Sequence, residues 1–196
     1  MLTEEEIKEI FLKTDAFLEG HFLLSSGLHS PYYLQCAKVL QYPEFAEILC
    51  REIGDKVKEL DVEIDFVIAP AIGGIIVSYE TARHLGVRGI FAERKDGVNL
   101  ILRRGFEIKP GEKALVVEDV VTTGKSTKET MEVVKSCGGE VVAVASLVDR
   151  SGGSVDFGVP FVTLWSLEVP AYKPESCPIC REGKIPLEKP GSRKIV

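Results

Sequence analysis

The chain has 196 residues, of which 45% are hydrophobic and 28% are charged, as in soluble globular proteins. Its net charge of −6 argues against a general nucleic-acid-binding surface, and its apolar runs are all shorter than the roughly 20 residues of a membrane span. The Glu- and Lys-rich N-terminus does not resemble a signal peptide, so we expect a cytoplasmic protein that binds neither nucleic acid nor membrane.

Segments with helical spacing alternate along the chain with short apolar runs that suit buried strands. Thr3 and Glu6 have the spacing of a capping box at the start of the first helix. The pattern predicts helices over 3–17, 43–60, 75–85 and 127–137, and strands over 66–69, 89–92, 114–117, 141–148 and 161–167. This alternation implies an α/β fold with right-handed crossovers and a mostly parallel sheet. In such a sheet, ligands bind beyond the carboxyl ends of the strands.

Two loops that follow predicted strands carry residues suited to anions. The loop after the first strand contains Gly73 and Gly74, which let backbone amides approach an anion closely, although an ordinary strand-to-helix turn would also use them. The loop after the second strand is basic, with Arg94 and Lys95 adjacent. Both loops should meet at one edge of the sheet, because neighbouring parallel strands end there.

The loop after the third predicted strand is the most informative. The carboxylates of Glu118 and Asp119 can accept hydrogen bonds from two vicinal hydroxyls or hold a hydrated divalent cation. Residues 122–126 are small and polar, so their amides can meet a phosphate at the N-terminus of the next helix. Ser126 is predicted to cap that helix, with Glu129 completing a capping box. The segment suits a phosphorylated sugar; the alternative is an ordinary turn with solvated acids.

The loop after the fourth predicted strand begins with Asp149 and Arg150. A guanidinium at the carboxyl end of a strand can bind a planar, anionic ring through two parallel hydrogen bonds, which a Lys could not reproduce. A structural salt bridge is the alternative interpretation of Arg150. The chain therefore offers groups for a phosphorylated sugar and for an anionic ring at the same predicted edge.

Two stretches of the sequence carry a resemblance to a known family. Residues 116–126 run apolar, acidic, apolar and then Thr-, Gly- and Ser-rich, and they resemble the phosphoribosyl pyrophosphate (PRPP) motif of type I phosphoribosyltransferases. Residues 22–33, with their Ser-Gly-x-x-Ser-Pro-Tyr core, resemble the hood of orotate phosphoribosyltransferases. The resemblance implies the type I phosphoribosyltransferase fold over residues 1–170, with a small N-terminal hood at about 17–40 and an irregular C-terminal tail over 171–196.

The resemblance also implies a reaction: PRPP and orotate would give orotidine 5′-monophosphate and pyrophosphate, in the synthesis of UMP. Catalysis would fall to Arg94, Lys95 and Asp119, and orotate binding to Thr122 and Arg150. Mg²⁺ would be bound mainly through PRPP, and a homodimer is usual in this family. The residues that would bind PRPP are Gly73, Gly74, Arg94, Lys95, Glu118, Asp119, Val120, Val121, Thr122, Thr123, Gly124, Lys125 and Ser126.

The chain departs from the family pattern at two places. Many orotate enzymes carry a Lys where Ser25 stands, and the Lys and His that usually follow the Arg-Lys pair have no counterpart among residues 98–100. Arg103 or Arg104 could substitute, or both could be ordinary exposed strand charges. Two other functions stay open: a phosphoribosyltransferase for another base, which the hood string disfavours, and a PRPP-responsive nucleic-acid-binding regulator, which the acidic composition disfavours.

Five cysteines are scattered through the chain without the pattern of a secreted domain, so we expect reduced thiols. Cys177 and Cys180 form the one close pair, which suits half of a zinc site, a redox dithiol or ordinary surface thiols. A full metal site would need ligands from distant parts of the chain or from a partner subunit. His21 and His29 have no carboxylate or thiol at metal-binding spacing, so we interpret them as hydrogen-bonded or exposed side chains and not as ligands.

Overall fold

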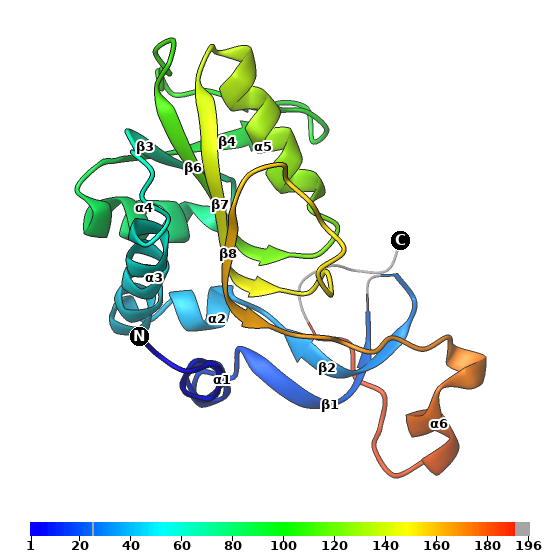
Figure 1. The fold of residues 1–196 in the computed structure, drawn as a ribbon. Helices are drawn as coiled ribbons and strands as arrows, with labels where there is room; N and C mark the ends of the chain where they lie inside the picture. The colour runs from blue at the N-terminus through cyan, green and yellow to red at the C-terminus, as the bar shows by residue number, and fades with distance from the viewer. Residues whose placement is uncertain (25, 191–196) are drawn as a thin grey trace.

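The computed structural model describes residues 1–24 and 26–190, so the departure at Ser25 and the end of the tail at 191–196 lie outside its described part. Its centre is a six-stranded sheet in the order β5-β4-β3-β6-β7-β8 (Figure 1). Neighbouring strands are parallel except β4 and β5. The predicted α/β fold with a mostly parallel sheet is confirmed. The strands are β3 (Phe66–Pro70), β4 (Arg88–Arg94), β5 (Leu100–Leu102), β6 (Lys113–Val121), β7 (Glu140–Asp149) and β8 (Phe161–Ser166).

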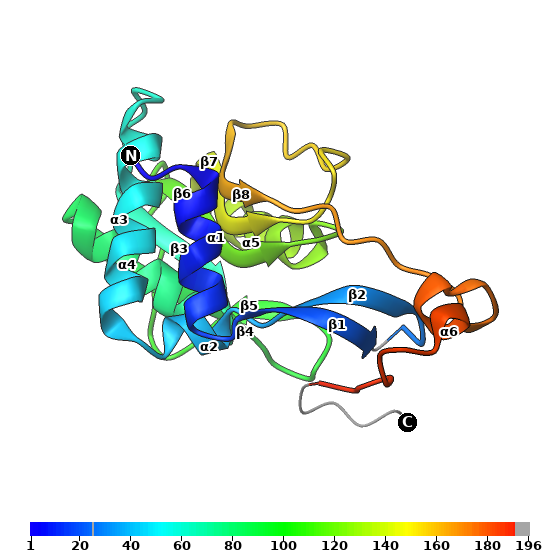
Figure 2. The ribbon, with the colours of Figure 1, turned by 90° about the horizontal axis from the view of Figure 1, so that it is seen from below.

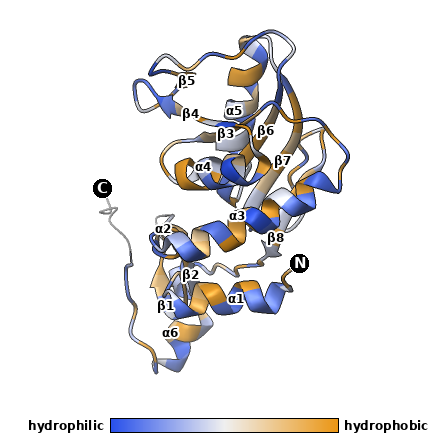
Figure 3. Cartoon of the chain, turned by 90° about the vertical axis from the view of Figure 1, so that its left-hand side faces the viewer, coloured by the Kyte–Doolittle hydropathy of each residue, from blue (hydrophilic) through white to orange (hydrophobic). Residues whose placement is uncertain are grey.

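Helices cover both faces of this sheet. Helices α3 (Pro43–Lys58) and α4 (Gly74–Leu85) lie on one face and α5 (Lys125–Ser136) lies on the other (Figure 1). Successive strand residues therefore enter two different apolar cores, as Val67 and Ile68 of β3 do. Figure 3 shows hydrophobic and hydrophilic residues side by side along α3, as expected for a helix with one buried face.

The first helix, α1 (Glu4–Lys13), begins and ends for local reasons. The predicted capping box is confirmed: the Glu6 amide donates to Oγ1 of Thr3 at 3.3 Å, and the Thr3 amide donates to the Glu6 carboxylate at 2.8 Å. The helix ends before the predicted Phe17, because Asp15 takes a φ of 52° and turns the chain into a strand.

The N-terminal segment after α1 forms a layer of its own. Strands β1 (Phe17–Leu23) and β2 (His29–Leu34) make an antiparallel hairpin that extends away from the main sheet (Figure 2), and α2 (Ala37–Leu40) follows. Phe11 and Phe17 meet Trp165 of β8 edge to face, with ring centroids 5.5 and 5.1 Å apart, and so anchor this layer to the sheet. The hairpin and α2 occupy the region predicted as the hood; the division into a domain and a tail stays a prediction.

The C-terminal tail folds back onto the hairpin. It is largely irregular, with a single turn of 3₁₀ helix (Pro174–Ser176) and the short α6 (Pro178–Glu182). Tyr172 and His29 exchange two backbone hydrogen bonds of 2.8 Å. Further on, the Glu188 amide donates to the His21 carbonyl at 2.8 Å, and the Leu23 amide donates to the Glu188 carbonyl at 2.7 Å. In the part of the chain that the structure describes, no helix is long and apolar enough to cross a membrane.

Candidate active site

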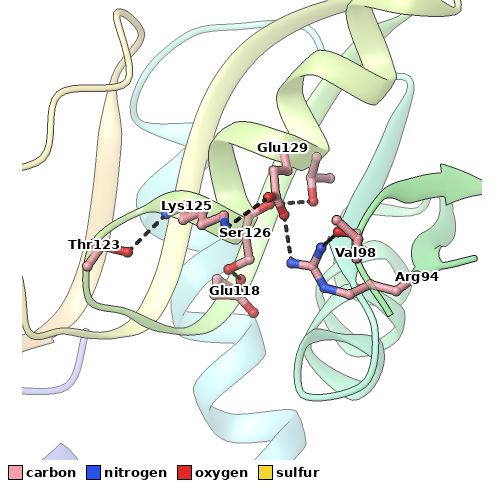
Figure 4. Close-up of polar contacts among 8 residues, drawn as sticks. Arg94, Val98, Glu118, Thr123, Lys125, Ser126 and Glu129 are labelled. Atoms are coloured by element: carbon pink, nitrogen blue, oxygen red, sulfur yellow. Dashed lines mark hydrogen bonds and ion pairs between the residues drawn. The ribbon is translucent and has the colours of Figure 1, made fainter. Parts of the chain in front are cut away.

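The candidate site is centred on two neighbouring carboxylates on β6. This strand extends past its predicted end, so Glu118 and Asp119 lie within the strand and not after it. Glu118 is only 5% exposed, and its Oε2 accepts a hydrogen bond of 2.8 Å from Oγ of Ser126 (Figure 4). Asp119 is half-buried, and its Oδ1 accepts a hydrogen bond of 3.0 Å from the Val120 amide. The sheet thus fixes both carboxylates near the carboxyl end of β6.

The electrostatics of this pair favour a ligand. Burial, and then the charge of Asp119, raise the pKa of Glu118 to about 8 against the opposing hydrogen bond from Ser126. Burial raises the pKa of Asp119 as well. Carboxylates with raised pKa values gain from a nearby cation or from hydroxyl donors, because either one compensates for the lost water.

The loop between β3 and α4 passes directly against this acid pair. A Cβ at Gly73 would lie 2.7 Å from Oδ2 of Asp119, and a Cβ at Gly74 would lie 2.6 Å from the Cβ of Ala69. Neither position has room for a side chain, so the two glycines let the backbone reach the carboxylates. The structure therefore brings Gly73 next to Asp119 and Gly74 near Glu118, although α4 and the β4–β5 hairpin separate the two segments along the chain.

The loop from β6 to α5 turns sharply at Gly124. This residue has a φ of 69° and is buried, and a Cβ there would lie 2.6 Å from Cγ1 of Val155. The Lys125 amide donates to Oγ1 of Thr123 over 3.4 Å, and α5 begins at Lys125. The turn places the backbone amides of the first turn of α5 beside the acid pair, where a phosphate would accept their hydrogen bonds.

The predicted capping box of Ser126 and Glu129 is wrong. The residue at the N-cap of α5 is Gly124, so Ser126 lies inside the first turn. Its hydroxyl donates to Glu118, and the Glu129 carboxylate accepts a hydrogen bond from Arg94 (Figure 4). Both side chains therefore connect the helix to other parts of the site, and neither caps it.

The β4–β5 hairpin carries Arg94 to the side of α5. Nη2 of Arg94 donates to Oε2 of Glu129 at 2.6 Å, and Nη1 donates to the Val98 carbonyl (Figure 4). The Lys95 amide closes the hairpin turn by donating to the Asn99 carbonyl at 3.1 Å. The Lys95 side chain is exposed and has no polar partner among residues 1–24 and 26–190. Of the two predicted cations, Arg94 and Lys95, the structure thus places only Arg94 against α5.

Arg103 and Arg104, the other cations of this region, are occupied at the surface. They lie 3.6 and 3.0 Å from the carboxylate of Glu93, and their side chains are 51% and 61% exposed. This arrangement favours the interpretation that both are ordinary surface charges.

Arg150 lies next to the end of β6. The Arg150 amide donates to the Val121 carbonyl at 2.8 Å. Arg150 therefore lies beside Thr122, the first residue of the loop between β6 and α5. Nε of Arg150 is buried and has no hydrogen-bond partner among the described residues, and no carboxylate there forms an ion pair with it. The side chain borders an open cavity of about 400 Å³ that Ser151 and Glu168 also line. Burial lowers the pKa of the Arg150 guanidinium. A buried N–H group without a partner at a cavity indicates a ligand site.

One contact behind the site has no counterpart in the sequence reasoning. The buried Cys36, at the start of α2, has its Sγ 3.8 Å from the carbonyl oxygen of Asp119, 83 positions along the chain. Burial, and then the charge of Asp119, raise the pKa of this thiol well above its usual range. Cys36 is therefore a neutral packing group between the N-terminal layer and the acid pair. No local spacing could have indicated a contact of this kind.

The comparison with known protein families agrees with the sheet, the acid pair and the loop that carries Gly73 and Gly74. Residues 37–157 match the phosphoribosyl transferase domain family, and this range includes all of the loops described above. The chain belongs to the phosphoribosyltransferase family.

Relatives of nearly the same length narrow this assignment. The orotate phosphoribosyltransferase of Caldanaerobacter subterraneus subsp. tengcongensis is 58% identical over 194 residues, which cover 99% of this chain and 100% of that protein. The one of Thermotoga maritima is 56% identical over 189 residues, 96% of this chain and 99% of that protein. The crystal structure of orotate phosphoribosyltransferase from Aeropyrum pernix superposes with a TM-score of 0.67 and 30% identity over 82% of this chain and 93% of that one. Within its family, the chain groups with the orotate phosphoribosyltransferases.

Proposed function

We propose that the protein transfers the ribose 5-phosphate group of PRPP to orotate, which releases pyrophosphate and forms orotidine 5′-monophosphate. One observation carries this proposal: the acid pair, with Glu118 buried and Asp119 half-buried, lies near the end of β6, and beside it, just after the adjacent strand β7, Arg150 has a buried Nε without a hydrogen-bond partner in the described part of the chain. The acids suit the vicinal hydroxyls of a ribose, and the Arg150 guanidinium suits a planar ring that carries a carboxylate.

The acid pair and its two loops form the PRPP half of the proposed site. Glu118 and Asp119 accept hydrogen bonds from the ribose hydroxyls. The backbone of residues 122–126 donates to the 5′-phosphate at the N-terminus of α5. Gly73 and Gly74 bring their amides to the pyrophosphate, which the closeness of Gly73 to Asp119 and of Gly74 to Glu118 supports. These contacts fix C1 of the ribose at the cavity beside Arg150, and such positioning removes a large part of the barrier.

The reaction then needs charge stabilisation and little covalent chemistry. The bond between C1 and the pyrophosphate oxygen breaks, and its electron pair leaves with the pyrophosphate. A ring nitrogen of orotate forms the new bond to C1 and gives up its proton to the medium. The carboxylates stabilise the positive charge that develops on the ribose, while Arg94 and Lys95 stabilise the negative charge of the leaving group. Thr122 and Arg150 hold orotate in line.

Mg²⁺ is the proposed cofactor, bound mainly through the oxygens of PRPP. When bound, it offsets the charge of the pyrophosphate and so makes it a better leaving group. The residues present fit this cation, because Glu118 and Asp119 are hard oxygen donors whose pKa values burial raises. A divalent cation brought by the substrate would favour their ionised forms.

We also propose that the protein acts as a homodimer in the cytoplasm. The exposed Lys95 side chain, which has no polar partner in the described part of this chain, is available to reach the site of a second copy. The five cysteines are all free, which suits a reducing compartment.

The test is a comparison of acceptor bases. The purified protein is mixed with PRPP and Mg²⁺ and with orotate, adenine, hypoxanthine or uracil, and pyrophosphate release and the loss of orotate absorbance are followed. We expect turnover with orotate alone. Turnover with a purine or with uracil, but not with orotate, would show that orotate is not the acceptor base. PRPP binding without turnover of any base would indicate a regulator.

A further inference from the structure

The contact between the hairpin and the tail contains a cluster of four potential metal ligands. His21 on β1 and His29 on β2 face Cys177 and Cys180 of the tail, and one ligand atom from each of these residues lies within 4.8 Å of the other three. His21, His29 and Cys177 are at most 5% exposed, whereas Cys180 is exposed. Figure 2 shows α6, which contains Cys180, at the outer end of the hairpin, away from the main sheet.

The distances within the cluster match a tetrahedral centre. The two sulfur atoms each lie 3.6 Å from Nε2 of His21, and Sγ of Cys180 lies 3.3 Å from Nδ1 of His29. The two ring nitrogens are 3.0 Å apart. Tetrahedral Zn²⁺, with Zn–S bonds of about 2.3 Å and Zn–N bonds of about 2.05 Å, separates S from N by about 3.6 Å and N from N by about 3.3 Å. These four distances are each within about 0.3 Å of the tetrahedral values, and the other two ligand-to-ligand distances are at most 4.8 Å, so the four atoms are grouped closely enough to bind one ion.

The hydrogen bond on the far side of one ring favours metal binding over a simple polar contact. Nδ1 of His21 lies 3.2 Å from the carbonyl oxygen of Ile185, which can only accept a hydrogen bond from it. This bond places the proton of a neutral His21 on Nδ1 and leaves the Nε2 lone pair directed at the two sulfur atoms. Metal-binding histidines use this arrangement, in which a backbone carbonyl fixes the tautomer and the ring orientation.

The backbone holds the ligand-bearing segments in place on both sides of the cluster. The reciprocal bonds of His29 with Tyr172 lie before the two cysteines in the tail, and those of Glu188 with His21 and Leu23 lie after them. Cys177 and Cys180 sit at the turn into α6, with the Cys-x-x-Cys spacing of structural zinc sites. The site is thus built from two segments that the fold already fixes against each other.

We propose that His21, His29, Cys177 and Cys180 bind one Zn²⁺ ion as a structural site that fastens the tail to the hairpin. Two thiolates and two imidazoles in a tetrahedron select zinc over the hard cations Mg²⁺ and Ca²⁺. A Rieske-type [2Fe–2S] cluster also uses two Cys and two His, but it divides them between two irons, whereas here both sulfur atoms lie 3.6 Å from Nε2 of His21, as around a single ion. Four protein ligands leave no open position for a substrate, so the ion has no catalytic role. The proposal departs from the interpretation of both histidines as hydrogen-bonded or exposed side chains and not as ligands, and it does not depend on the proposed reaction.

The test measures metal content and ligand chemistry on the full chain without an affinity tag. Elemental analysis of protein purified from zinc-supplemented cells should give about one zinc per chain. Replacement of zinc by Co²⁺ should produce the intense visible bands of tetrahedral cobalt and a thiolate-to-cobalt charge-transfer band in the near ultraviolet. Cys177→Ser and Cys180→Ser should each reduce the zinc content at least tenfold.

Matched controls come from the same chain. Cys137→Ser removes an exposed thiol and His84→Asn removes a histidine that pairs with Asp55, so neither should change the zinc content. If the Cys177 and Cys180 variants fail to fold, the cobalt spectrum of the unmodified chain decides. Any of three results would overturn the proposal: a zinc content below about one ion in ten chains, a cobalt spectrum without a charge-transfer band, or a disulfide between Cys177 and Cys180 under reducing conditions.

Discussion

The proposed substrate-binding edge of the sheet and the contact between the hairpin and the tail are assembled in opposite ways. At the sheet edge, each functional group comes from a short segment that follows or ends a strand, and the parallel sheet alone brings the segments together. In the hairpin–tail contact, His21 of β1 and Cys177 of the irregular tail meet across 156 positions of the chain. Chemistry at the strand ends of a parallel sheet can be predicted from local motifs, whereas a site between a hairpin and a distant irregular tail appears only in the folded chain.

The largest expected effect at the sheet edge follows from Asp119→Asn. An amide in place of this carboxylate removes charge from beside the reacting ribose, so kcat/KM for PRPP should fall by about 10²- to 10³-fold. Steady-state kinetics measure this loss, with Asp61→Asn on an exposed turn after α3 as the matched control. A loss of less than threefold would remove Asp119 from the proposed machinery.

Cys177→Ser should lower the thermal stability of the protein and leave its activity nearly unchanged. Loss of a zinc ligand should lower the Tm by on the order of 10 °C, because structural zinc contributes directly to folding. Well below that transition, kcat/KM for PRPP should stay within about threefold of the unmodified chain, since Cys177 lies outside the sheet edge. Thermal denaturation and kinetics on one preparation measure both quantities. A loss of activity as large as that of Asp119→Asn would show that the two regions do not act separately.

Glu118 should give the stability of the ligand-free sheet edge a pH dependence of its own. Its pKa is raised from 4.5 to about 8 in the folded chain, so between these values the folded chain binds more protons than the unfolded chain. The contribution to stability is therefore complete below about pH 4.5 and is lost as the pH rises through about 8. Glu118→Gln should raise the Tm of the ligand-free protein at about pH 8.5 by on the order of 5 °C and leave it nearly unchanged at about pH 5. An equal change at both pH values would contradict the raised pKa.

The smallest effects are expected at Arg103 and Arg104. Both pair with Glu93 at the surface, so Arg103→Gln and Arg104→Gln should each change kcat by less than about threefold. The kcat at saturating substrates measures this. A loss of kcat of more than tenfold in either variant would identify that Arg as the cation that replaces the missing loop Lys and His. The proposed active site would then include the residues that follow β5.

How far the sequence predicts this molecule depends on how local each feature is. The strands of the main sheet and the acids at 118–119 depend on a few neighbouring residues, so periodicity and motif could identify them. The role of Ser126 could not be predicted, because its spacing to Glu129 satisfies a capping box while its hydroxyl bonds to Glu118 instead. Strands β1 and β2 lack a regular alternation of buried and exposed residues, which hides them from a periodicity argument.

The two ligand sites repeat this contrast. The position of Arg150 beside the acid pair could be predicted because parallel strands end at the same edge, although its lack of an ionic partner in the described chain is seen only in the structure. His21 and His29 gave no signal, because their spacing matches no metal motif and the cysteines that face them lie in the tail.

The division of the sheet edge into a PRPP half and an orotate half is tested most directly by the steady-state kinetics of Arg150→Ala, with each substrate varied in turn. The guanidinium contacts orotate alone in this account, so KM for orotate should rise at least about tenfold while KM for PRPP stays within about twofold. Equal increases in both KM values would contradict the assignment of Arg150 to orotate.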